Sequence, residues 1–233
     1  MDFDIEFFNK YAKAAKGKWL ELMCGTGRVS IPLLKKGIEL TCVDYSEEML
    51  KVLEQKTIDL SNKPKIICQD VCALNLGEKY ELICIPFNSF SEITDREKQK
   101  MALVRIFNHL SDDGLFICTL YNPSYRIKTA DGQIHVLGRF PLYQENSLVV
   151  SYYNQYDDMT QSVKGMQFYE IYNSSNVLTG KRFLDIHFSL ISQEAFEKMA
   201  LESGFAIKEV FGDYNFSRFT EESMFMNFVL KKR

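Results

Sequence analysis

The stretch that decides the fold reads Trp19-Leu-Glu-Leu-Met-Cys-Gly-Thr-Gly-Arg28. Its first half is an apolar run typical of a strand, and the run breaks at Gly25 and Gly27. An apolar pattern with helical spacing begins at Val29. A strand that enters a helix through glycines brings backbone N–H groups and the positive end of the helix close to a ligand. The stretch therefore predicts a ligand-binding turn, and Glu21, an acid inside the strand, is the feature that selects the ligand.

The composition favours a globular protein that acts on small molecules. Of 233 residues, 46% are hydrophobic and 25% are charged, so the chain can form one large core or a core with an elaboration. The net charge of −3 argues against a long contact with nucleic-acid phosphates. No apolar run is long enough to span a membrane, and the acidic N-terminus does not resemble a signal peptide. We expect a cytoplasmic protein with no nucleic-acid or membrane partner.

The six cysteines favour reduced thiols over a disulfide framework or a metal site. Cys42, Cys84 and Cys118 lie inside apolar runs, where a free cysteine acts as a small buried hydrophobe. Cys68 and Cys72 have neither a histidine nor a second cysteine pair nearby. We therefore expect no metal.

Up to about residue 120, apolar strand-like runs alternate with helical patterns. Strands are expected at residues 19–23, 40–43, 65–68, 80–85 and 115–120, and helices at 3–16, 27–36, after Ser46 and after a capping-box pattern that begins at Thr94. Continuous apolar strands that alternate with helices indicate an α/β fold with a parallel sheet covered on both faces.

The pattern changes after residue 120. Three strand-like runs at 149–156, 165–172 and 182–190 are separated by polar turns, which is typical of antiparallel hairpins. A helix from Ser192 and two strands at 206–210 and 224–230 close the chain. We therefore predict a core of residues 1–120 and 192–233, and an antiparallel β cap of residues 121–191 that covers the substrate.

Polar residues follow the first strands, at the sheet edge where a doubly wound fold binds its ligand. Glu21 precedes the glycines, Asp44 ends the second strand and Asp70 ends the third. Asp44 follows Gly27 at nearly the spacing of a ribose-binding acid, so a nicotinamide-dinucleotide site is one alternative. Against it, the third glycine of that motif is missing, and Glu21 would repel a pyrophosphate. An ammonium group would suit this acid.

These residues resemble the motifs of class I S-adenosylmethionine-dependent methyltransferases. The family's first motif has the form Glu/Asp-x-Gly-x-Gly-x-Gly, which Glu21-Leu-Met-Cys-Gly-Thr-Gly27 approaches. The later motifs resemble Val43-Asp44-Tyr-Ser-Glu-Glu-Met49-Leu, Gln69-Asp70-Val71, and Phe87-Asn88-Ser89-Phe90 followed by Thr94-Asp-Arg-Glu97. The resemblance covers about residues 17–120 and resumes in the last helix and strands. It implies a seven-stranded sheet of order 3-2-1-4-5-7-6 with a cap inserted after strand five.

The resemblance also implies a cofactor, S-adenosyl-L-methionine, with S-adenosyl-L-homocysteine as the product. Gly25 and Gly27 would approach its methionine part, Asp44 its ribose hydroxyls and Asp70 its adenine amine, while Val71 and Met49 would sandwich the ring. Arg28 would contact the cofactor carboxylate or face solvent. The full set of cofactor-binding positions that it implies is Glu21, Cys24, Gly25, Gly27, Arg28, Asp44, Tyr45, Met49, Asp70, Val71, Pro86, Phe87 and Asn88.

One position departs from the family pattern. Met23 stands where the first glycine of the motif is usual. A side chain there makes φ > 0 improbable, so we expect a tilted loop that still binds the cofactor.

The acceptor is less constrained than the cofactor. We expect methyl transfer to an oxygen or nitrogen of a small molecule, by a monomer or a homodimer formed through the cap. The alternatives are an RNA or protein methyltransferase and an inactive regulatory protein that binds the cofactor. The candidates for substrate binding are Tyr11, Phe90, Tyr121 and Asn122, and those for a general base are His187, His135, Tyr11 and Tyr214. A base is optional, because positioning supplies much of the rate enhancement.

Overall fold

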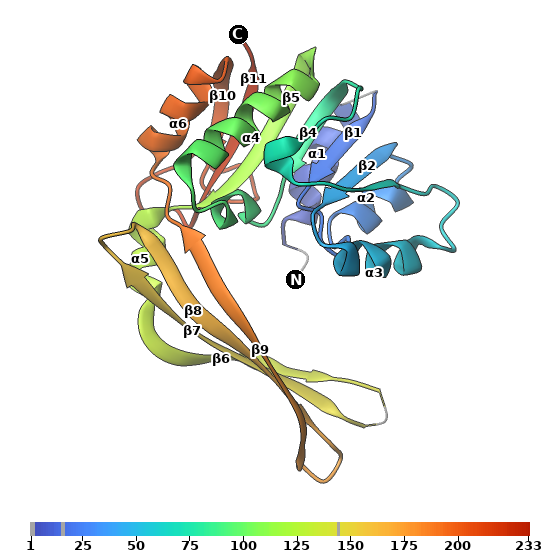
Figure 1. Cartoon of the computed structure of the whole chain (residues 1–233), viewed down its shortest axis with the longest axis vertical. Helices are drawn as coiled ribbons and strands as arrows, with labels where there is room; N and C mark the ends of the chain where they lie inside the picture. The colour runs from blue at the N-terminus through green and yellow to red at the C-terminus, as the bar shows by residue number, and fades with distance from the viewer. Residues whose placement is uncertain (1–2, 15–16, 144) are drawn as a thin grey trace. The chain divides into compact units, whose positions relative to one another are not determined.

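The computed structural model describes residues 3–14, 17–143 and 145–233. It divides into two compact units (Figure 1), the first formed by Met1–Asn122 and Ile191–Arg233 and the second by Pro123–Leu190. None of the helices in the described ranges is long and apolar enough to cross a bilayer.

The first unit contains a mixed sheet with the strand order β10-β11-β5-β4-β1-β2-β3. Its strands, as far as the chain is described, are β1 (Trp19–Leu22), β2 (Leu40–Asp44), β3 (Lys65–Cys68), β4 (Tyr80–Ile85), β5 (Leu110–Tyr121), β10 (Phe205–Phe211) and β11 (Phe225–Lys232). The pairs among β1 to β5 are parallel, and β11 runs antiparallel to both β5 and β10. In chain order this is 3-2-1-4-5-7-6, so the predicted fold class is confirmed.

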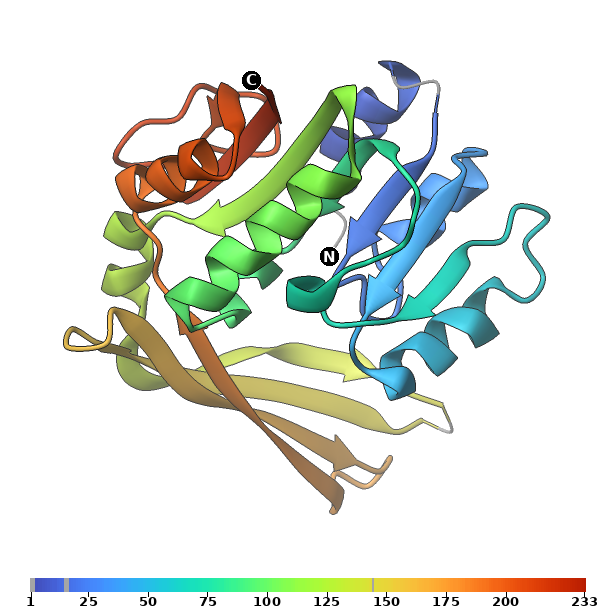
Figure 2. The same cartoon turned by 45° about the horizontal axis from the view of Figure 1, so that its top comes forward.

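Both faces of this sheet are covered by helices (Figure 2). Along β4, Ile83 and Ile85 face one apolar cluster and Leu82 and Cys84 face the other, because successive strand residues alternate between faces. The first cluster includes α4 (Arg96–His109) and α6 (Gln193–Glu202); the second includes α1 (Ile5–Ala14), α2 (Ser30–Lys35) and α3 (Glu47–Thr57).

Side-chain caps fix where three of these helices begin, and the cap of α6 is Ser192, whose hydroxyl accepts from the N–H of Ala195. The Ser46 hydroxyl accepts a hydrogen bond from the N–H of Met49, as expected for α3. At α4 the cap is Asp95, whose carboxylate accepts from the N–H of Lys98, so the prediction of a box beginning at Thr94 is wrong by one residue. A carboxylate at the cap also benefits from the positive end of the helix.

The second unit is an antiparallel sheet of order β6-β7-β8-β9. The unit begins with the helix α5 (Pro123–Thr129). The strands of its sheet are β6 (Asp131–Pro141), β7 (Ser147–Asp157), β8 (Ser162–Tyr172) and β9 (Leu178–Ser189). The antiparallel arrangement is confirmed, but the sequence pattern missed both α5 and β6. β6 is an edge strand that is exposed at nearly every position, so no face of it carries the apolar alternation that marks a half-buried strand.

Candidate functional site

The chain turns from β1 into α2 through three residues with positive φ. These are Met23 (φ 55°), Gly25 (φ 55°) and Gly27 (φ 83°), so the expectation that Met23 avoids this conformation is wrong. Hydrogen bonds hold the turn: the N–H of Cys24 donates to the Val43 carbonyl over 3.1 Å, and the N–H of Gly27 donates to the Cys24 carbonyl over 3.1 Å. A left-handed residue with a side chain costs roughly 1–2 kcal/mol, which the surrounding turn must offset.

The two glycines of this turn do different things. A Cβ added to Gly25 would lie 3.5 Å from the sulfur of Met49, an ordinary contact at the edge of a cavity. A Cβ added to Gly27 would lie 2.3 Å from Cδ1 of Leu53 in α3. Gly25 thus leaves the backbone open to a ligand, whereas Gly27 allows α3 to pack closely. Gly27 lines neither cavity, and its approach to the cofactor stays a prediction.

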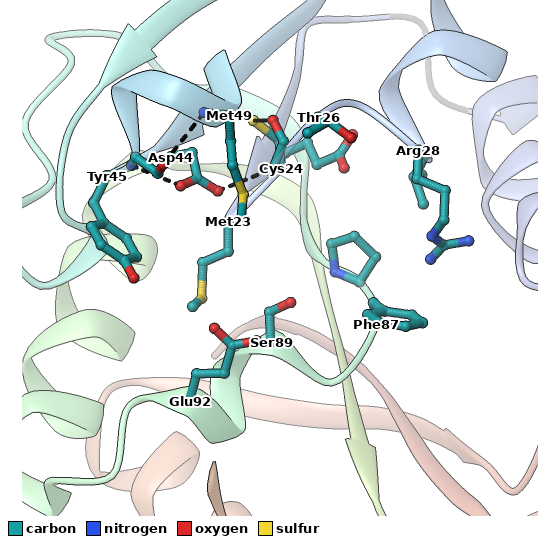
Figure 3. A pocket seen from close by; sticks show the side chains of 15 residues that line it. Met23, Cys24, Thr26, Arg28, Asp44, Tyr45, Met49, Phe87, Ser89 and Glu92 are labelled. Carbon is teal, nitrogen blue, oxygen red and sulfur yellow. Dashed lines mark hydrogen bonds between the residues drawn. The ribbon is translucent and has the colours of Figure 1, made fainter. Parts of the chain in front are cut away.

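Asp44, at the end of β2, joins the turn to the start of α3 (Figure 3). One of its carboxylate oxygens accepts from the N–H of Gly25 over 2.8 Å, and the other accepts from the N–H of Ser46 over 2.9 Å. The residue is buried and lines two adjoining cavities. Each oxygen keeps lone-pair capacity for a ligand hydroxyl.

Glu21 lies on β1 and is 1% exposed. Its carboxyl accepts a hydrogen bond from the Ser30 hydroxyl over 2.7 Å. Burial raises the pKa of the Glu21 carboxyl to about 8, because an ionised carboxylate loses its hydration there. Without a cationic partner, Glu21 is therefore largely protonated at neutral pH.

A cavity of about 220 Å³ opens at the carboxyl ends of β1, β2 and β4 (Figure 3). The sequence-predicted residues that line it are Glu21, Cys24, Gly25, Arg28, Asp44, Tyr45, Met49, Pro86 and Phe87. An adjoining cavity of about 420 Å³ is lined by Asp70 and Val71, also predicted. The two cavities share Met23, Asp44, Tyr45 and Glu92.

Arg28 reaches this cavity with its charge already paired. Its guanidinium donates two hydrogen bonds of 2.6 Å each to the carboxylate of Asp4, which is fully buried at the start of α1. The guanidinium carbon lies 4.8 Å from the centre of the Phe87 ring. Arg28 thus links α1 to the loop after β4, and Asp4 neutralises its charge.

Glu92 is an acidic residue of both cavities that the sequence did not reveal. It ends a 3₁₀ helix, η2 (Ser89–Glu92), and it lines both cavities. Burial raises the pKa of its carboxyl. Only the tight 3₁₀ turn directs this acid and Ser89 into the cavity, and the local sequence has no periodicity that predicts such a turn. Met23 and Thr26 also line the first cavity without having been predicted.

The loop after β4 contains two successive left-handed residues, Phe87 (φ 58°) and Asn88 (φ 60°). The N–H of Asn88 donates to the Thr119 hydroxyl over 3.0 Å. Its side chain is 4% exposed, lines neither cavity, and its Oδ1 has no hydrogen-bond partner within the described residues. The turn therefore buries Asn88 and presents Phe87 to the first cavity, and the role of Asn88 as a cofactor-binding position stays a prediction.

The structure does not gather the predicted substrate-binding residues at the cavity. Phe90 is fully buried, packs edge-on against Phe196 at 5.7 Å between ring centres, and lines neither cavity, so the structure places it in the core and its substrate role stays a prediction. The Asn122 amide donates to backbone carbonyls of Glu221 and Ser223, which ties the end of β5 to a C-terminal loop. Tyr121 stacks on Phe225, with ring centres 5.8 Å apart.

Tyr11 and Tyr214 lie outside both cavities. Tyr11 packs against Phe7 and lines a separate hollow with Asp112, near the start of β5 and therefore at the opposite edge of the sheet. Burial raises its pKa to about 12. Tyr214 is buried against Phe7, and burial also raises its pKa. Neither hydroxyl is suited to accept a proton at neutral pH.

The two histidine candidates belong to the second unit. His135 Nε2 lies 2.9 Å from a carboxylate oxygen of Asp131, and its ring stacks on Tyr152. His187 is exposed on β9 and pairs in register with Lys164. Their catalytic role stays a prediction. The described ranges contain no group of three or more histidine, cysteine or acidic residues arranged to hold a metal.

A family model described as a methyltransferase domain matches residues 20–114, which carry the turn, Asp44, Asp70 and the loop after β4. These residues form a methyltransferase domain. The whole chain has the class I methyltransferase fold: it superposes on the CcbJ methyltransferase from Streptomyces caelestis with a TM-score of 0.83, 22% identity, and coverage of 100% of this chain and 95% of that one.

Two further comparisons extend over nearly the whole chain. The sugar N-methyltransferase KedS8 from Streptoalloteichus sp ATCC 53650 has a TM-score of 0.78 and 16% identity, with 99% of this chain and 87% of that chain covered. The cypemycin N-terminal methyltransferase from Streptomyces sp is 24% identical over 215 residues, 92% of this chain and 82% of that protein. Two other curated proteins that match the sequence are covered over less than half of their own length, 45% of one and 38% of the other.

Proposed function

We propose that this protein transfers the methyl group of S-adenosylmethionine to a nitrogen or oxygen of a small-molecule acceptor. The observation that carries the proposal is the Asp44 carboxylate, which two backbone N–H groups fix between two adjoining cavities. A carboxylate held in this way suits the two ribose hydroxyls of an adenosyl group, because it offers two acceptor oxygens. A cavity on each side of it would take the amino-acid and adenine ends.

The other residues fit the same cofactor. Asp70 and Val71 would hold adenine in the larger cavity, where Asp70 can accept from the exocyclic amine. Gly25 and Glu21 would hold the amino-acid end in the smaller one, and an ammonium group there would favour the ionised form of Glu21. When bound, S-adenosylmethionine supplies a methyl group activated by its positively charged sulfur. The loop at Phe87 would then exclude water and position the acceptor for in-line attack.

We favour nitrogen as the methylated atom. By their names, KedS8 acts on a sugar nitrogen and the cypemycin enzyme on an N-terminus. Glu92 lines both cavities and is not assigned to the cofactor, while Arg28 is paired with Asp4 and Lys98 is a cation on the wall of the second cavity. An acid at this position disfavours an anionic acceptor and tolerates an amine, which attacks in its neutral form. The second unit, with His135 and His187, is the proposed acceptor-recognition part, and a peptide amine is the runner-up acceptor.

Two measurements test the proposal. Calorimetry with S-adenosylhomocysteine should show saturable binding at one site. Incubation with methyl-labelled S-adenosylmethionine and a panel of amino sugars, small amines, phenols and short peptides should give a labelled product from at least one amine. If the protein binds S-adenosylhomocysteine but methylates no acceptor, the result would favour an inactive regulatory protein that binds the cofactor. Absence of binding would refute the cofactor assignment.

A further inference from the structure

Met23 stands in the middle of the proposed cofactor site. It is one of four residues that line both cavities, together with Asp44, Tyr45 and Glu92. Figure 3 shows its side chain reaching from the end of β1 past Asp44 toward Ser89 and Glu92. Its thioether therefore lies at the boundary between the two cavities.

The backbone at this position is also unusual. Met23 has φ 55°, a conformation that costs a residue with a side chain and that glycine adopts freely. The positive φ sets the direction in which the side chain leaves the turn. The side chain is half-buried and packs against the apolar cluster that contains β4 and α4, so it is held in the cleft.

Neither the position of Met23 nor the volumes alone assign it a role, but together they limit what the cleft can hold. The first cavity, at about 220 Å³, is smaller than the roughly 300–1,000 Å³ typical of small-molecule sites. The second holds about 420 Å³, and Met23 lines it as well. Only a joined cleft accommodates a ligand that spans from Gly25 to Asp70.

We propose that Met23 is a gating side chain that divides the cofactor cleft and must move before a ligand can occupy both halves. This inference rests on the proposed function, because it assumes a ligand with an adenosyl end and an amino-acid end. A site that is open for only a fraction of the time binds with an affinity reduced by that fraction. Met23 then selects among ligands: it weakens those that cross the boundary and spares those that fill one side.

The test compares S-adenosylhomocysteine, which would span both cavities, with adenine, which would fill only the cavity beside Asp70 and has no ribose to reach Asp44. Titration calorimetry on the full chain should show that Met23→Ala binds S-adenosylhomocysteine at least about tenfold more tightly than wild type, equivalent to about 1.4 kcal/mol. Its affinity for adenine should change by less than about threefold. Met23→Leu, of similar volume, should stay within about threefold of wild type for both ligands.

Two further variants separate gating from other effects. Met23→Gly removes both the side chain and the φ penalty, so it should match Met23→Ala in affinity while raising the melting temperature relative to it. Met49→Ala shortens another methionine that lines the first cavity but not the second, and it should weaken binding because that side chain lies on the wall of one cavity.

The outcomes are distinct. Weaker binding by Met23→Ala, or equal gains for both ligands, would overturn the gate while leaving the proposed function standing. Equal tightening by Met49→Ala would show a general effect of enlarging the cavity and would also overturn it. If neither the wild-type protein nor any of the variants binds S-adenosylhomocysteine, the proposed function is refuted, and the proposal that Met23 gates the cleft is refuted with it.

Discussion

Asp44 is the residue on which the proposed cofactor site depends most. It fixes the backbone of Gly25 and Ser46, and it would also accept both ribose hydroxyls. Hydrogen bonds to a charged group contribute roughly 1.5–3 kcal/mol each. Asp44→Ala should therefore weaken S-adenosylhomocysteine binding at least about tenfold.

Calorimetry measures this effect, with Asp59→Ala as the control. Asp59 is an exposed acid that lines neither cavity, so its loss changes the net charge equally without touching the site. Equal affinities for the Asp44 variant and the control would contradict the assigned role of Asp44.

Glu21 links the stability of the fold to pH. Its pKa is about 8 in the folded protein against an ordinary value of 4.5. Between these values the folded protein holds a proton that the unfolded chain has released. The free energy of unfolding therefore falls as pH rises from about 5 to 8, with a limiting slope of about 1.4 kcal/mol per pH unit from this group.

Glu21→Gln should remove this slope, because a glutamine side chain is neutral at every pH. Chemical denaturation of both proteins at several pH values between 5 and 8 measures the difference. Parallel stability profiles would show that Glu21 has an ordinary pKa in the folded state.

At the scale of elements, Gly27 decides how closely α3 approaches the turn after β1. An alanine Cβ there would collide with Leu53 at 2.3 Å and would also have to accept φ 83°. Gly37 has nearly the same φ, 84°, but a Cβ there would meet nothing within 4 Å. Alanine substitutions at Gly27 and Gly37 therefore separate the cost of a positive φ, which both would have, from the cost of a packing collision, which only Gly27 would have.

Both alanine variants should lose about 1–2 kcal/mol of unfolding free energy to the positive φ. Gly27→Ala should lose roughly a further 1–3 kcal/mol to overpacking against α3. Urea denaturation of the two variants and wild type gives the values. Equal losses at the two positions would mean that α3 shifts at no cost, and then Gly27 would not set its packing.

Across the whole molecule, the two units differ in how deeply their strands are buried. β1 and β2 are buried at every position, whereas β6 is exposed along almost all of its length. Local stability follows buried apolar contacts. Hydrogen exchange measured by mass spectrometry should therefore show amides of β6 exchanging well before those of β1, β4 and β5.

The β7–β8 pair serves as the internal control, since both strands are inner members of the second sheet. Their amides should exchange more slowly than those of β6, because they have ladder partners on both sides. Uniform protection across the chain would mean that the two units open as one cooperative body.

The amino-acid sequence by itself determined the parallel sheet and the edge at which its acids gather, while the resemblance to the family's motifs supplied the strand order and the remaining predicted lining residues. It could do so because buried parallel strands form continuous apolar runs, and because their carboxyl ends bring Glu21, Asp44 and Asp70 to one edge of the sheet. These are local signals or consequences of chain order. The edge strand β6 was not predicted from the sequence, because residues exposed on both of its faces leave no periodic pattern of apolar side chains.

Only the tertiary structure decided the rest of the site. It put Glu92 and Met23 into the cavity, paired Arg28 with Asp4, and turned Gly27 toward α3 and Phe90 into the core. Each of these depends on contacts between segments far apart in the sequence, or on a left-handed backbone held by such contacts. Met23 shows most clearly what the sequence cannot predict. A residue with a side chain is expected to avoid positive φ, but Met23 has φ 55° in a turn held by backbone hydrogen bonds.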